Sequence, residues 1–204
     1  YITVQLICKM NRIVQIIIFL LVLISCNKEV VNTPNPENGD SEFISAVDIS
    51  RYPEISNVNP TFYDLDGNQE DFLTILKENG INAVRLRLWV NPLNEHSGFN
   101  EVKQFSQTLK TKGFKTWLTL HYSDTWADPS VQEIPSAWLT QINNTGPLGD
   151  LLYNYTYDTL NDLANSNLLP DIVQVGNEIN AMILQTGELK WPIDWTRNSL
   201  LINK

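Results

Sequence analysis

Residues 81–90 read INAVRLRLWV and residues 114–122 read FKTWLTLHY, and these two stretches decide the fold. Both are short, rich in β-branched and aromatic residues, and preceded by a glycine (Gly80 and Gly113), which predicts two strands. Aliphatic residues alternate with Arg, Trp, Thr and His along each stretch, so one face is apolar and the other is polar. We therefore predict that each strand packs against helices with one face only.

Strands and helices alternate on both sides of this pair. FISAVDIS (43–50) and DIVQVG (171–176) have the pattern of two more strands. Apolar residues at helical spacing predict three helices. The first lies around 69–79, the second is capped by Asn100 and ends at Gly113, and the third lies around 148–165. Strands that alternate with helices in this way form βαβ units, which place the strands in a parallel sheet.

The polar faces of the four predicted strands distinguish between two kinds of parallel sheet. An open doubly wound sheet carries helices on both faces, so its strands are apolar on both. Here one face of each strand becomes polar at its C-terminal end, with Asp48, Arg85, His121 and Glu178. A barrel interior with an active site at the C-terminal rim explains these four residues together. No glycine-rich phosphate loop follows any strand, which weakens the alternative of a nucleotide-binding sheet. We therefore predict an α/β fold of the (β/α)8 TIM-barrel class.

Four βα units occupy residues 43–204, whereas a closed barrel has eight and usually about 250 residues. An open half barrel would leave two unpaired edge strands and would expose its interior to water. We therefore expect the sequence to be a shortened version of a longer chain. The alternative is that partner chains complete the sheet.

The overall composition is that of an acidic globular protein. Of the 204 residues 43% are apolar, and 14 Lys and Arg stand against 23 Asp and Glu for a net charge of -9. Nucleic-acid binding depends on cations that neutralise phosphates, so no nucleic-acid partner is expected. The two cysteines, Cys8 and Cys26, are too few for a disulfide framework or a Cys-rich zinc site.

Residues 1–26 have the pattern of a leader. Lys9 and Arg12 precede the apolar run IVQIIIFLLVLI (13–24), which is shorter than the ~20 residues of a membrane-spanning helix. Ser25 and Cys26 follow, and the segment resembles the bacterial lipoprotein signal, in which the cysteine is lipidated. The alternative is an ordinary cleaved signal with an incidental cysteine. We predict an extracytoplasmic lipoprotein anchored to a membrane through lipid on Cys26.

The polar segment that follows the leader, residues 27–42, has no apolar periodicity and contains two Pro and one Gly. Such a composition is typical of a flexible tether. We therefore divide the chain into a leader (1–26), a tether (27–42) and the N-terminal half of a barrel domain (43–204).

Several longer motifs resemble one family of enzymes. They are FISAVDISRYPEI (43–55), INAVRLRLWVNP (81–92), HYSDTWADP (121–129) with PSAW (135–138), and VQVGNEIN (173–180). In this order and spacing they resemble glycoside hydrolase family 53, the endo-β-1,4-galactanases that act on galactan and type I arabinogalactan. The resemblance implies a TIM barrel, a retaining mechanism, no cofactor and a plant cell-wall polysaccharide as substrate.

The resemblance also implies a role for the residues after the fourth strand. Glu178 matches the acid/base of the clan, and Asn177 would hydrogen-bond the sugar 2-hydroxyl. The family's nucleophile is a Glu after the seventh strand, which lies beyond Lys204, so we assign no residue to that role. The alternative for Glu178 is a loop carboxylate that caps the next helix.

Other polar residues on the predicted rim have two interpretations each. Arg85 would either orient the nucleophile or form an interior ion pair with Asp48. His121 would either position a sugar hydroxyl or be a buried, hydrogen-bonded imidazole. We expect no metal site, since His96 is the only other histidine.

Aromatic and acidic residues near the rim complete the predicted substrate site. Trp89, Trp126 and Tyr122 fit surfaces that stack on the C–H face of galactose, or else they belong to the core or anchor loops. Asp124 and Asp128 would either bind hydroxyls or support their loop, and we see no run of oxygen ligands for calcium.

Three functions remain open from the sequence. The favoured one is a surface-tethered galactanase, monomeric when complete, of which residues 27–204 alone would be inactive because the nucleophile is absent. The second is a related clan enzyme that cleaves mannan or glucan, and a panel of substrates would separate it from the first. The third is a non-catalytic glycan-binding lipoprotein.

The lipoprotein prediction can be tested by cell fractionation. If Cys26 is acylated, the protein should partition with membranes, and Cys26→Ser should release it or leave an unprocessed precursor. Unchanged fractionation together with a mature N-terminus that carries no lipid mass would contradict the prediction.

Overall fold

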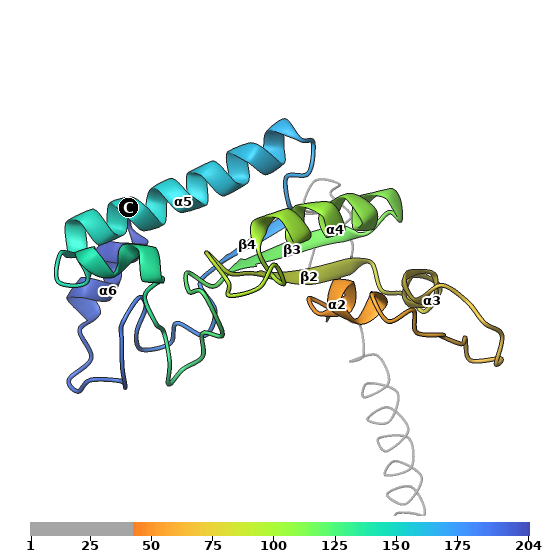
Figure 1. Cartoon of the computed structure of the whole chain (residues 1–204), viewed down its shortest axis with the longest axis horizontal. Helices are drawn as coiled ribbons and strands as arrows, with labels where there is room; N and C mark the ends of the chain where they lie inside the picture. The colour runs from red at the N-terminus through yellow and green to blue at the C-terminus, as the bar shows by residue number, and fades with distance from the viewer. Residues whose placement is uncertain (1–42) are drawn as a thin grey trace, which may run out of the picture. The chain divides into compact units, whose positions relative to one another are not determined.

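The computed structural model describes residues 43–204, so the predicted leader (1–26) and tether (27–42) lie outside the described part of the chain. Four parallel strands form one sheet in the order β1-β2-β3-β4 (Figure 1). Their bounds are Ala46–Asp48 for β1, Ala83–Leu88 for β2, Lys115–Leu120 for β3 and Ile172–Val175 for β4. All four predicted strands are therefore confirmed, each with shorter bounds.

The register of the strands aligns their polar residues in rows. Asp48 of β1 lies opposite Arg85 of β2, and Arg87 of β2 lies opposite Thr119 of β3. Thr119 in turn lies opposite Gln174 of β4. The side chains of one row therefore point to the same face of the sheet, as the alternation in the sequence predicts.

The three predicted helices are present as α3 (Phe72–Glu78), α4 (Phe99–Thr111) and α5 (Thr145–Asn165). In α3 the side chain of Asp71 caps the helix by accepting a 2.9 Å hydrogen bond from the backbone N–H of Thr74. The predicted cap of α4 is wrong, because Asn100 lies inside the helix and Gly98 is the N-cap. The first turn of α4 includes Phe99, whose ring packs against the core, so the helix begins one residue before Asn100.

Three further elements have no counterpart in the sequence prediction. They are α2 (Tyr52–Ser56), the 3-10 helix η1 (Ser136–Gln141) and α6 (Trp195–Ile202). The first two have at most six residues, too few to show a helical period. Within residues 43–204, no helix is both long and apolar enough to cross a bilayer.

One face of the sheet forms the hydrophobic core. Figure 1 shows α4 lying along the strands, with α5 on the same side. Most of the buried residues of the strands and long helices come from β2, β3, α4 and α5: Val84, Leu86, Leu88, Leu118, Leu120, Val102, Phe105, Leu109, Leu148, Leu152 and Leu163. Leu73 of α3, Trp138 of η1 and Leu201 of α6 belong to the same core. The opposite face carries the polar rows, so helices and site occupy different faces of the same strands.

The strand β4 ends in a tight turn at Gly176, which has a backbone φ of 76°. A Cβ at this position would lie 2.6 Å from Cγ2 of Ile179, which packs against the core. Gly67 also has a positive φ, 84°, but a Cβ there would meet nothing within 4 Å. The two glycines therefore share the same backbone requirement and differ in the space around them.

This difference predicts the effect of two alanine substitutions. We use the term completed chain for the full-length protein that contains residues 43–204. In it, Gly176→Ala should lower the free energy of unfolding by about 1–3 kcal/mol more than Gly67→Ala, because only Gly176→Ala adds a steric clash to the backbone strain. Urea denaturation measures both values, and equal losses of stability would contradict the expected packing at the end of β4.

Candidate active site

The guanidinium of Arg85, a residue in the middle of β2, connects the carboxyl ends of β1 and β4. Its Nη1 donates to Oδ2 of Asp48 over 2.5 Å, at the end of β1. Its Nη2 donates to Oδ1 of Asn177 over 2.8 Å, after β4, and its Nε lies 3.4 Å from Oε1 of Gln174. Arg85 therefore holds residues 37 and 92 positions away in the sequence in one cluster, and the predicted ion pair with Asp48 is present.

Asp48 is held in its ionised form by this cluster. Burial alone would raise its pKa, but hydrogen bonds from the backbone and hydroxyl of Ser50 and the charge of Arg85 outweigh that effect and lower the pKa. Oδ1 accepts both bonds from Ser50, at 3.0 Å and 2.6 Å. The carboxylate of Asp48 therefore acts as an anionic partner that fixes Arg85.

The backbone leaves the extended conformation directly after β4. Gly176 and Glu178 both have a positive φ, 76° and 51°. Alternation along the strand therefore stops at Val175, and it does not determine where residues 176–178 point. Asn177, which strict alternation would turn away from Arg85, instead accepts its hydrogen bond.

Asn177 is fixed on its other side by the loop that follows β3. Its Nδ2 donates to the carbonyl of Ala127 over 2.7 Å. Gln132 makes a second connection, because its Nε2 donates to the carbonyls of Asn177 and Asp128, at 2.7 Å and 3.0 Å. Gln132 is only 3% exposed, and sequence reasoning missed it, since a lone glutamine in a polar loop gives no signal of burial.

Glu178 lies next to this fixed asparagine, and its own side chain is exposed. Within residues 43–204 its carboxylate has no hydrogen bond and no ion pair. A positive φ in a residue other than glycine is uncommon, and such strained residues cluster at functional sites. The geometry therefore presents Glu178 to solvent at the end of β4, and the alternative of a helix cap is not observed.

His121 is buried beside the arginines of the polar face. It is 2% exposed, and its Nδ1 has no hydrogen-bond partner among the described residues. Burial, and then the positive charges of Arg87 and Arg85, lower the pKa of His121 to about 4. The imidazole is therefore neutral at ordinary pH, and its free nitrogen does not have the hydrogen bond expected of a satisfied core histidine.

The three aromatic residues predicted to stack on sugar lie in different surroundings. Trp126 is 54% exposed and meets the half-buried Trp89 edge to face, with ring centroids 5.7 Å apart. Tyr122 is 2% exposed, and its hydroxyl pairs with that of Thr156 on α5 over 2.8 Å. The structure thus places Tyr122 in the core and not on a sugar-binding surface, on the side of the sheet that Leu118 and Leu120 occupy.

The two acidic residues near Trp126 support loops. Asp124 accepts hydrogen bonds from the backbone N–H of Asn91 and from the N–H and hydroxyl of Ser136, at 2.7–3.0 Å. Asp128 accepts from the N–H and hydroxyl of Ser130 in a local turn. The sequence predicts that Asp124 and Asp128 each either bind sugar hydroxyls or support their loop, and these contacts show support of the loop. In the described part of the chain no three His, Cys, Asp or Glu residues gather as a metal site requires.

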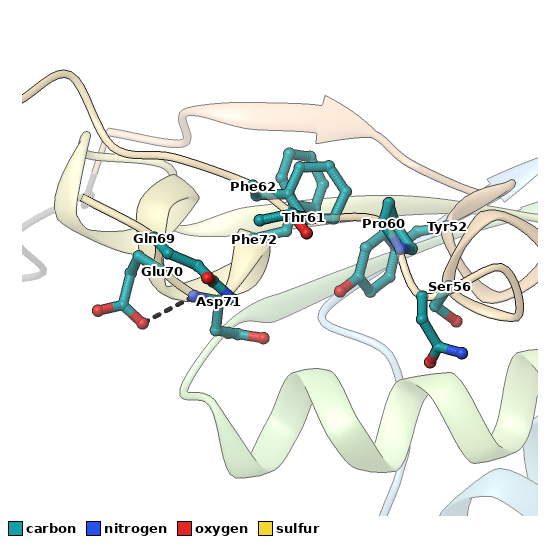
Figure 2. Close-up of a pocket in the computed structure, with 10 residues that line it drawn as sticks. Tyr52, Ser56, Pro60, Thr61, Phe62, Gln69, Glu70, Asp71 and Phe72 are labelled. Carbon is teal, nitrogen blue, oxygen red and sulfur yellow. Dashed lines mark hydrogen bonds between the residues drawn. The ribbon is translucent and has the colours of Figure 1, made fainter. Parts of the chain in front are cut away.

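A cavity of about 630 Å³ lies away from this cluster, between α2 and the start of α3. Figure 2 shows the residues that line it, with the rings of Phe62 and Phe72 stacked at 4.7 Å between centroids and Tyr52 nearby. Its lining includes none of the predicted site residues. The candidate site is therefore the rim cluster around Arg85 and not this cavity.

Comparison with known proteins identifies the family of the chain. The sequence profile of glycosyl hydrolase family 53 matches residues 44–204. The chain belongs to this family. The family assignment covers all four strands and every rim residue described above.

Two named galactanases are similar to the chain over two thirds or more of its length. An arabinogalactan endo-β-1,4-galactanase from Cellvibrio japonicus (strain Ueda107) is 38% identical over 177 residues, which are 85% of this chain and 46% of that protein. One from Humicola insolens is 39% identical over 137 residues, 67% of this chain and 39% of that protein. The chain thus spans less than half the length of these relatives.

Solved structures of the family show the same fold. The GH53 catalytic domain of Ignisphaera aggregans has a TM-score of 0.70 at 37% identity, over 82% of this chain and 48% of that one. A structure from work on two fungal β-1,4-galactanases has a TM-score of 0.69 at 34% identity, over 78% of this chain and 46% of that one. The predicted TIM-barrel class is therefore confirmed, and the four strands correspond to about half of a family 53 barrel.

Proposed function

We propose that residues 43–204 supply the first four βα units and the acid/base of a retaining endo-β-1,4-galactanase that acts on galactan and type I arabinogalactan. The observation that carries this proposal is the pair Asn177-Glu178 at the end of β4, held by Arg85 in a family 53 chain. The substrate follows from the relatives, which are named as arabinogalactan endo-β-1,4-galactanases. Fixed surroundings for Asn177 and an unbonded carboxyl on Glu178 support an acid at this position.

Retaining hydrolysis requires two carboxyl groups about 5 Å apart. One protonates the departing glycosidic oxygen, and the other attacks the anomeric carbon to form a glycosyl-enzyme. In this proposal Glu178 donates the proton first and then, as a carboxylate, removes a proton from the attacking water. The nucleophile belongs to the second half of the barrel.

The neighbouring residues have supporting roles in this mechanism. Arg85 keeps the amide of Asn177 in place, so that Asn177 can hydrogen-bond the sugar 2-hydroxyl. His121 is neutral and buried beside the arginines, and in this proposal it positions a sugar hydroxyl. Trp126 offers an exposed indole for stacking on a galactosyl ring.

We also propose that the enzyme is anchored outside the cytoplasm through lipid on Cys26 and acts as a monomer. The leader pattern of residues 1–26 supports the anchor. A polar tether of residues 27–42 would allow the domain to reach a polymer that cannot diffuse to the membrane surface.

The role of Glu178 can be tested in the completed chain. Glu178→Ala should reduce cleavage of galactan by at least about a hundredfold, because no group protonates the poor leaving oxygen. With substrates that carry an activated phenol leaving group, Glu178→Ala should slow the formation of the glycosyl-enzyme less, because such a group needs little protonation. Added azide should speed up turnover and yield a β-galactosyl azide, because a small anion replaces the water that no longer has a base.

The matched control is Glu188→Ala, which removes an exposed glutamate from the loop that follows. This variant should retain the activity of the wild type. Near-normal galactan cleavage by Glu178→Ala, or an α-linked azide product, would contradict the proposed role.

A further inference from the structure

The segment that carries Glu178 is held by side chains and not by other backbone groups. Among residues 43–204, the backbone of residues 177–184 makes no hydrogen bond to another backbone group. Its carbonyls instead accept from side chains elsewhere in the chain, which are Gln132 at Asn177, Asn198 at Ala181, and Arg197 at Ile183 and Leu184. The contact from Gln132 is the one of these that lies next to Glu178.

This contact falls on the peptide group between Asn177 and Glu178. The Nε2 of Gln132 donates to the carbonyl of Asn177 over 2.7 Å. A peptide group is planar, so a fixed carbonyl also fixes the direction of the N–H of Glu178. Glu178 has a φ of 51°, a conformation that is unfavourable outside glycine and persists where surrounding contacts impose it. Gln132 therefore fixes the backbone from which the side chain of Glu178 extends.

Gln132 is held in one orientation by its own surroundings. It is 3% exposed and follows a tight turn that is closed by two backbone hydrogen bonds between Asp128 and Val131, at 2.8 Å and 3.1 Å. Its Nε2 also donates to the carbonyl of Asp128 over 3.0 Å. Both partners of the amide are carbonyl oxygens, so its nitrogen and not its oxygen must face them.

The two neighbours in the turn after β4 are held by different contacts. The side-chain amide of Asn177 bonds Arg85 and the carbonyl of Ala127. The carboxylate of Glu178 has no hydrogen bond or ion pair within residues 43–204, so its position depends on the backbone that carries it. Arg85 thus orients the side chain of Asn177, whereas Gln132 orients the peptide group that leads to Glu178.

We propose that Gln132 is a positioning residue for proton transfer, which holds the peptide group before Glu178 so that the carboxyl of Glu178 meets the departing glycosidic oxygen. The inference rests on the proposed function, because it takes Glu178 as the acid/base. General acid catalysis requires hydrogen-bond distance between the acid and the leaving oxygen, and a displacement of about 1 Å costs on the order of a hundredfold in rate. Loss of the Gln132 contact therefore slows the steps that need a proton from Glu178.

The test compares two leaving groups in the completed chain. Gln132→Met removes both donor hydrogens and keeps an unbranched side chain of similar length. Its kcat/KM on galactan should fall by about tenfold to a hundredfold, because a displaced acid protonates the poor leaving oxygen slowly. Its kcat/KM on 2,4-dinitrophenyl β-1,4-galactobioside should fall by less than about threefold, because this leaving group needs little protonation. A purely structural role would lower both values by the same factor.

The matched control is Gln141→Met, the same substitution in the same loop. The amide oxygen of Gln141 accepts a 3.3 Å hydrogen bond from Asn144, and the side chain makes no contact with the turn after β4 among the described residues. This variant should retain the activity of the parent protein on both substrates.

A second variant decides the question where Gln132→Met does not fold. Gln132→Glu keeps the shape of the side chain and replaces the amide with a carboxyl. The ionised carboxyl repels the two carbonyls, whereas the protonated one donates a hydrogen bond to one of them. The kcat/KM of this variant on galactan, divided by that of the parent at the same pH, should therefore rise by about tenfold as the pH falls through the pKa of the introduced carboxyl.

The outcomes separate the positioning role from the proposed function. Equal losses on the two substrates, no loss on either, or a pH-independent ratio for Gln132→Glu would refute the role of Gln132 and leave that of Glu178 intact. If Glu178→Ala keeps its activity on galactan, the acid/base assignment fails, and this inference fails with it. If the completed chain cleaves another β-1,4-linked polysaccharide and not galactan, the galactanase proposal fails, and the same comparison with that polymer and its dinitrophenyl disaccharide supports or refutes the role of Gln132.

Discussion

The guanidinium of Arg85 is the contact on which the site depends, because it joins the carboxyl ends of β1 and β4 from the middle of β2. Parallel strands bring their carboxyl ends to one edge of a sheet, but the hydrogen bonds of the ladder do not orient the side chains there. Arg85 supplies that orientation by pairing with Asp48 and bonding Asn177. A planar group with several donors suits this task better than an ammonium, since it can bond two partners in fixed directions.

The turn after β4 makes the contact with Asn177 possible. Gly176 takes a backbone conformation that L-residues rarely adopt, and the next residues leave the alternation of the strand. Asn177 can then turn to Arg85 and to the loop after β3, which Gln132 also ties to it. The same turn gives Glu178 a strained backbone and an exposed carboxyl, a combination that fits a residue placed for chemistry more than for stability.

Sequence patterns could predict the part of the molecule that depends on periodicity. The alternation in 81–90 and 114–122 located β2 and β3 and separated the core face from the polar face, and the register of the sheet agrees with both. Alternation failed beyond Val175, because a positive φ interrupts the strand and sequence spacing no longer reports direction. Tyr122 has the same parity as Leu118 and Leu120, so alternation by itself places its ring in the core, where the structure has it. The role of Gln132 depends on contacts between distant loops, which a local pattern does not contain.

A double-mutant cycle on Arg85 and Asn177 tests the central claim most directly. The completed chain and its Arg85→Met, Asn177→Ala and doubly substituted forms would be compared by kcat/KM on galactan. If Arg85 acts by holding Asn177, the double variant should be little worse than the more damaged single variant, with a coupling energy of about 1–3 kcal/mol. Losses that add to within about 0.5 kcal/mol would show that the two residues act independently and would contradict the account.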